Sequence, residues 1–197
     1  MNISELKRRI GNKIKTNYVK RQLNLSDISI ISMNCIGGVL YHDVGARFLS
    51  PTIDLFFFAD DFIKFVTNLN YYLNLTPVVT MGEKYPIGTL DDIKIYFMHY
   101  SDIESALNKW EERKKRVNPD KIFVIMAEQN NFSDQSFNDF LNIPYPKILF
   151  SRNAKLKSTD VVYYPKYKEL KELPNIIDQR DMYYKGSLVK AIQKAYR

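Results

Sequence analysis

The chain has 197 residues, of which 45% are hydrophobic and 14% aromatic, so it can bury a core and is not intrinsically disordered. Its single cysteine excludes an internal disulfide and is typical of a reducing compartment. The formal net charge of +7 is uneven: residues 1–23 carry +6, residues 182–197 carry +4, and the stretch between them carries −3. A mildly acidic body with basic ends argues against a nucleic-acid-binding face, so we expect no nucleic acid partner.

No targeting or membrane-spanning segment is visible in the sequence. The first ten residues, MNISELKRRI, lack the apolar centre of a signal peptide. No stretch approaches the roughly 18 uninterrupted apolar residues of a membrane span. We therefore expect a cytoplasmic protein that forms a single α/β domain over residues 1–197.

The first predicted element is a basic amphipathic helix within residues 1–23. Apolar residues recur there at spacings of three and four, at Ile3, Leu6, Ile10 and Ile14. One interpretation is a surface helix that docks on the body through this apolar stripe. The other is an interfacial helix attracted to anionic lipid, which would place the protein peripherally at the inner face of the membrane.

Strands and helices then alternate along the chain. The expected strands are short apolar runs at residues 27–33, 53–58, 77–81, 93–98, 121–126, 147–150 and 161–164. Helical spacing or capping residues predict helices at 60–73, from Ser101 onward, after Ser133, and at 182–197. This pattern predicts a three-layer α/β sandwich with a mixed, mostly parallel sheet flanked by helices, and with the basic helices 1–23 and 182–197 at its periphery.

The first expected strand ends in residues suited to a ligand site. Asn34 and Cys35 follow it directly, and Gly37 and Gly38 come next. Ligands of open α/β sheets lie beyond the carboxyl ends of the strands. Glycines at a helix start allow positive φ and leave amides for a phosphate, although a tight strand-to-helix turn needs glycine just as well.

The expected strand at 93–98 is also followed by polar residues, His99 and Tyr100. If the two strand ends meet, His99 could act as a general base and Cys35 as a nucleophile. The alternatives are a histidine bonded to the backbone and a buried, inert thiol. The other histidine, His42, is expected to face solvent or to pack.

Further candidate contacts for the ligand lie elsewhere in the chain. They are Arg47 and Ser50 near the S-P-T sequence, Tyr100 after His99, and Trp110 and Arg113 on the helix that follows Ser101, with Arg116 one turn later. Arginines suit a phosphorylated or acidic ligand. A turn at S-P-T and a core tryptophan with solvated arginines are the structural alternatives. Two histidines and one cysteine argue against a zinc site, and we expect no metal and no cofactor.

Several of these motifs together resemble those of an uncharacterised bacterial family whose members are often labelled exopolysaccharide or capsule biosynthesis proteins. The resemblance covers about residues 25–150 and comprises S-x-N-C-x-G-G, S-P-T, Y-P-x-G, and H-Y followed by W-x-x-R-x-x-R. Ile36 stands where the family often has an aromatic residue, which weakens any argument for sugar stacking there. The resemblance implies an α/β sandwich and a link to surface polysaccharide.

The leading hypothesis from these features is an enzyme of cell-surface polysaccharide biosynthesis, a transferase that acts on a nucleotide-sugar or lipid-linked saccharide. In it the glycines would hold a phosphate, His99 would act as base, and Arg47 or Arg113 would neutralise charge. The alternatives are a non-catalytic binding or scaffold protein of the same machinery and a Cys-dependent hydrolase or acyltransferase. The sequence does not indicate the oligomeric state.

Overall fold

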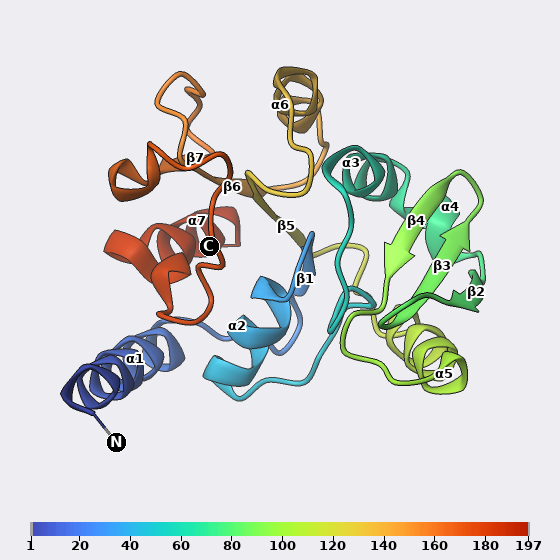
Figure 1. Ribbon diagram of the computed structural model, residues 1–197, viewed down its shortest axis with the longest axis horizontal. Coiled ribbons are helices and arrows are strands. Elements are labelled where there is room, and N and C mark those ends of the chain that lie inside the picture. Colours follow the sequence, from blue (N-terminus) through green and yellow to red (C-terminus); the bar gives the residue numbers. More distant parts are fainter. Residues whose placement is uncertain (1, 197) are drawn as a thin grey trace.

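The computed structural model describes residues 2–196 and is built around a four-stranded parallel sheet (Figure 1). Its strands are β1 (Ser29–Ser32), β5 (Ile122–Ala127), β6 (Lys147–Ser151) and β7 (Val161–Tyr163), in the order β1-β5-β6-β7. All neighbouring pairs are parallel. The near-continuous apolar runs of β1 and β5 are buried throughout, as expected for strands covered on both faces.

Alternate side chains of these strands enter two separate cores. Ile31, Val124 and Leu149 pack with one core, whereas Ile30 and Ile125 pack with the other. The second core is closed by α1 (Ile3–Gln22), α2 (Ile36–Val44), the 3₁₀ helix η2 (Asp181–Gly186) and α7 (Ser187–Ala195). The first core is closed by α3 (Ala59–Thr67), α4 (Leu69–Leu73), α5 (Ile103–Lys114) and α6 (Asp134–Leu141). The predicted α/β class with helices on both faces of the sheet is confirmed.

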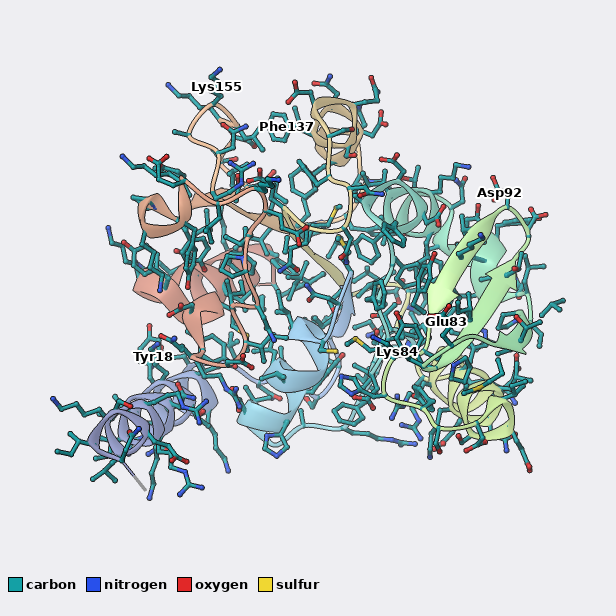
Figure 2. All side chains as sticks on the ribbon, in the orientation of Figure 1. Tyr18, Glu83, Lys84, Asp92, Phe137 and Lys155 are labelled. Carbon is teal, nitrogen blue, oxygen red and sulfur yellow. The ribbon has the colours of Figure 1, made fainter. Side chains whose placement is uncertain are left out.

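The antiparallel strands form their own sheet instead of joining the parallel one. This second sheet has the order β2-β3-β4, from β2 (Val78–Met81), β3 (Pro86–Leu90) and β4 (Ile93–Tyr96). It lies beside α4 and α5 at the right of Figure 1, and side chains fill the space between it and the parallel sheet (Figure 2). The prediction of one mixed sheet was therefore too simple, since parallel and antiparallel strands are segregated.

The predicted strand at 53–58 is instead an extended connection that joins the two sheets. Phe56 forms an isolated bridge with Tyr96 of β4, and the Phe57 amide donates to the Met33 carbonyl just past β1. Asp54 has a φ of 66°, which interrupts extended geometry at its start. The segment therefore ties the antiparallel sheet to the end of β1, which is the region of interest below.

Two predicted helices are also divided in the structure. The helix expected over 60–73 breaks at Asn68, which separates α3 from α4. The helix expected over 182–197 begins as η2 and continues as α7 only after Gly186, whose φ of 68° is left-handed. A short 3₁₀ turn, η1 (Pro165–Tyr167), lies between β7 and η2. Met1 and Arg197, which the predicted terminal helices included, lie outside the described residues.

Candidate functional site

A cleft of about 460 Å³ opens beyond the carboxyl ends of β1 and β5. Three parts of the chain surround it: the turns that follow these two strands together with the start of α2, the residues Phe56, Met98 and His99, and the segment before η2. Its lining residues are Asn34, Cys35, Val39, Phe56, Met98, His99, Gln129, Asn130, Glu172, Asn175, Ile177 and Asp178. The asparagine–cysteine turn and His99 therefore meet at one cleft, as the hypothesis required.

Asn34 is the residue that organises the floor of this cleft. Its Oδ1 accepts from the amide of Ile36, the first residue of α2, at 3.1 Å, and its Nδ2 donates to Gln129 Oε1 at 2.9 Å. The Gln129 Nε2 in turn donates to the Leu173 carbonyl at 2.6 Å. This chain of amides ties the ends of β1 and β5 to the segment before η2, so that three walls of the cleft are fixed to one another.

Cys35 lies in the cleft but has the wrong electrostatic surroundings for a nucleophile. Its Sγ is 4.0 Å from the Met98 Sδ. Burial, together with the negative charge of Asp54, raises the pKa of the Cys35 thiol from 9.0 to about 11. At neutral pH the thiol is therefore almost entirely protonated, and its environment is that of an inert cysteine.

His99 is exposed on the rim of the cleft, next to Met98. Its backbone amide donates to the Asp54 carbonyl at 3.4 Å, so its position depends on the 53–58 connection. It follows β4, an edge strand of the antiparallel sheet, and not a strand of the parallel sheet that contains β1. His42 does not line the cleft, and its side chain is 81% exposed.

The two glycines do not form the expected phosphate cradle. Both lie within α2, and neither has a positive φ. The Gly37 amide donates to Ser32 Oγ at 3.0 Å, so this donor is used within the fold. A Cβ at Gly37 would lie 2.5 Å from the same Ser32 Oγ, whereas one at Gly38 would be 3.4 Å from Ile53. Gly37 is thus needed for close packing of α2 on β1.

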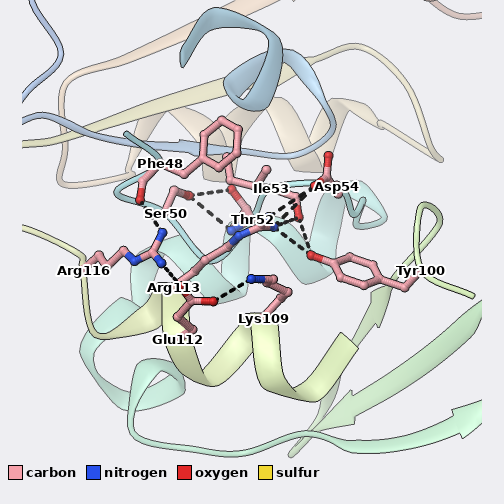
Figure 3. Close-up of polar contacts among 10 residues, drawn as sticks. All are labelled: Phe48, Ser50, Thr52, Ile53, Asp54, Tyr100, Lys109, Glu112, Arg113 and Arg116. Carbon is pink, nitrogen blue, oxygen red and sulfur yellow. Dashed lines mark hydrogen bonds and ion pairs between the residues drawn. The ribbon is translucent and has the colours of Figure 1, made fainter. Parts of the chain in front are cut away.

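Arg113 is a structural residue and not a free cation. It is buried, and its Nη1 donates to the Ile53 carbonyl at 3.0 Å and to the Tyr100 hydroxyl at 2.7 Å, with longer contacts to Asp54 (Figure 3). Its guanidinium lies 5.3 Å from the Phe48 ring centroid. Burial raises the pKa of Tyr100 to about 12, and the phenol remains neutral. Arg113 therefore fixes the connection that leads to His99.

The remaining predicted contacts also lie outside the cleft lining. Ser50 is fully buried and bonds to Thr52, whose Oγ1 accepts from the Ser32 amide. Trp110 is buried and its Nε1 donates to the Leu75 carbonyl. Arg47 is exposed elsewhere on the surface. Arg113 and Arg116 of the W-x-x-R-x-x-R motif bond to the carbonyls of Ile53 and Phe48, which lie on either side of S-P-T, and Arg116 also bonds to Glu112 (Figure 3).

Several residues that line the cleft are not predicted from the sequence. Gln129 and Asn130 follow β5 as Asn34 follows β1, so the rule on strand ends could have found them. Asn130 adopts a φ of 53° and donates from its side chain to the Phe57 carbonyl. Glu172, Asn175 and Asp178 come from an irregular segment, where no periodic pattern marks them.

The charge of the lining is negative. Glu172 and Asp178 are its carboxylates, and its lining residues include no lysine or arginine. Asn34, Gln129, Asn130 and Asn175 contribute amides, and Phe56 contributes the one aromatic ring other than the imidazole of His99. Within residues 2–196, no three His, Cys, Asp or Glu side chains are grouped as a metal-binding set. Such a surface suits many neutral hydrogen-bonding groups better than a diphosphate.

Comparison with known proteins identifies the family but no activity. One family, described as "Domain of unknown function (DUF1919)", matches residues 6–193. A protein of Haemophilus influenzae named "Uncharacterized protein" is 27% identical over 162 residues, which is 81% of this chain and 79% of that protein. Neither description mentions a polysaccharide, a capsule or a transferase.

Proposed function

The chain belongs to the DUF1919 family, whose description assigns no activity, and from the cleft we propose that it binds a saccharide in cell-surface polysaccharide biosynthesis. The observation that carries this proposal is the lining: four amide side chains and two carboxylates surround a cleft with an apolar face. The labels of the family that the sequence resembles support the polysaccharide context.

Saccharide hydroxyls both donate and accept hydrogen bonds. An amide side chain has two N–H donors and a carbonyl acceptor, and a carboxylate accepts from neighbouring hydroxyls. Each of the four lining amides uses one N–H within the fold, which leaves its second N–H for a saccharide hydroxyl. Phe56, Val39 and Ile177 provide an apolar surface for the C–H face of a sugar ring. A volume of about 460 Å³ is in the usual range for a small-molecule site.

The negative lining favours the acceptor saccharide over the phosphates of a donor. In a transferase, His99 on the rim would remove the proton of an acceptor hydroxyl as that oxygen bonds to the anomeric carbon of the donor. The nucleoside diphosphate would leave with the electrons of the broken bond. A non-catalytic saccharide-binding protein uses the same cleft without this step.

The Cys-dependent hydrolase has less support. A thiol with a pKa of about 11 contains little thiolate at neutral pH, and the nearby Asp54 carboxylate opposes its ionisation further. In the proposal, Cys35 therefore contributes to the shape of the cleft and not to the chemistry.

The test is a thermal-shift screen of the full chain with neutral saccharides and nucleotide-sugars. A ligand at 100 times its Kd stabilises a protein by about 2.7 kcal/mol, which is readily seen. We expect neutral oligosaccharides to raise Tm. The absence of a shift with every saccharide at millimolar concentration would contradict the proposal.

The two histidines provide a matched pair for separating catalysis from binding. His99→Ala should abolish sugar transfer and polysaccharide production, whereas His42→Ala should leave both unchanged, because His42 is 81% exposed and outside the lining. If both variants support normal production and still bind saccharide, the protein is a binding module and not a transferase.

A further inference from the structure

Helix α1 exposes four apolar residues on one side and docks on the body through its opposite side. Ile3 is 74%, Leu6 43%, Ile10 52% and Ile14 65% exposed; we call these four residues the α1 stripe. At 3.6 residues per turn they fall within an arc of about 80° on one side of the helix. An ordinary surface helix buries such a stripe, so the first interpretation drawn from the sequence is wrong.

The contacts that hold α1 come from other positions. Asn12 Nδ2 donates to the Asp178 carbonyl at 2.9 Å, and Lys15 Nζ donates to the Gln179 carbonyl and lies 3.5 Å from an Asp181 oxygen. Near the end of the helix, Val19 is fully buried. These contacts already fix the orientation of α1, and they leave the stripe turned away from the cores. The helix stands at the edge of the molecule in Figure 1, and Figure 2 shows its side chains reaching into open space.

The charge of the helix indicates what covers the stripe. Seven lysines and arginines stand against the single acid Glu5. By helical geometry Lys7 and Lys13 flank the stripe on its two sides, and both are exposed. An apolar stripe bordered by basic side chains is the pattern of a helix that lies in the interface of an anionic bilayer. A second copy of the same helix would instead bring two strongly basic surfaces together.

The length and polarity of α1 exclude a spanning role. Its 20 residues include many charges, and within residues 2–196 no helix combines the length and apolarity needed to cross a bilayer. We propose that α1 docks the protein on an anionic lipid surface, with the α1 stripe inserted at the boundary between headgroups and acyl chains and with Lys7 and Lys13 on the headgroups. The segment that α1 contacts, around Asp178, also forms one wall of the cleft.

Cosedimentation of the full chain with vesicles tests this proposal without any saccharide. Vesicles of phosphatidylcholine alone are compared with vesicles that also contain phosphatidylserine. We expect at least tenfold tighter binding to the anionic vesicles, weakened by salt because the attraction is screened. Equal binding to both, or no binding to either, would overturn the proposal.

Two double variants separate the apolar and charged contributions. Ile10→Gln/Ile14→Gln and Lys7→Gln/Lys13→Gln should each weaken binding at least tenfold, and neither disturbs a buried residue. In the same assay, an unchanged affinity of the stripe variant would overturn the proposal. So would a concentration-dependent dimer that this variant abolishes, because a second copy would then cover the stripe.

Matched controls come from other surfaces of the chain. Lys155→Gln/Lys157→Gln removes the same charge from an exposed loop, and Lys155 lies far from α1 (Figure 2). Val78→Gln/Met81→Gln removes apolar groups that are 72% and 52% exposed on β2. Both controls should bind like the unaltered chain. If the lysine control loses as much affinity as Lys7→Gln/Lys13→Gln, the attraction is a property of net charge and the assignment to α1 is wrong.

Discussion

The reactivity of Cys35 tests the electrostatics of the cleft. Its pKa of about 11, compared with an ordinary 9.0, means that only about 1 in 10,000 thiols is ionised at pH 7, where an unperturbed thiol would have about 1 in 100. The more basic thiolate is also the better nucleophile, which offsets up to about tenfold of this roughly 100-fold deficit. Alkylation at neutral pH should therefore be slower than for the unfolded chain by about tenfold or more.

The pH profile of alkylation is more informative than any single rate. Iodoacetamide labelling, followed by intact mass, should keep rising about tenfold per pH unit well above pH 9, because the ionisation lies near 11. The urea-unfolded chain is the control, since Cys35 is the only cysteine in it. Asp54→Asn removes a negative charge beside the thiol, which lowers the pKa and raises the rate at pH 8. A rate that levels off below pH 8 in the folded protein would refute this reasoning and restore Cys35 as a nucleophile.

Two further predictions concern the supports of the cleft and are read out by denaturant unfolding. Gly37→Ala should lower the free energy of unfolding by about 1–3 kcal/mol, because its Cβ would lie 2.5 Å from Ser32 Oγ. Gly38→Ala should be neutral or stabilising. Equal effects of the two variants would contradict the packing argument. Arg113→Met should lower the free energy of unfolding by about 3 kcal/mol, because two hydrogen bonds from a buried guanidinium are lost. Arg47→Met, at an exposed position, should lower it by less than about 0.5 kcal/mol. A stable Arg113→Met protein would mean that the network in Figure 3 does not hold the 53–58 connection.

The sequence predicted the meeting of Cys35 and His99, but for a reason that is only partly right. Cys35 follows a parallel strand, so the rule on strand ends placed it correctly. His99 follows β4 in the antiparallel sheet and reaches the same cleft because the connection through Phe56 and Phe57 joins that sheet to β1. Such long-range pairing leaves no local pattern in the sequence.

Residue type also could not distinguish a binding arginine from a structural one. Arg113 was a candidate to bind an anionic ligand, yet its guanidinium donates hydrogen bonds to the carbonyl of Ile53 and the hydroxyl of Tyr100. Periodicity likewise predicted the helix α1 and its stripe but not which face docks. That face carries the buried Val19, and with it Asn12 and Lys15, whose partners lie more than 160 residues away along the chain.

The central claim is that a saccharide binds in the cleft at the ends of β1 and β5. The most direct measurement is a titration followed through the side-chain amide NMR signals of Asn34, Gln129, Asn130 and Asn175, with a neutral oligosaccharide added to the full chain. Binding in the cleft should shift these four signals together until they saturate, while the signals of exposed asparagines elsewhere, such as Asn17, should not shift. Unmoved cleft amides in the presence of a bound saccharide, or no binding of any saccharide, would contradict this claim.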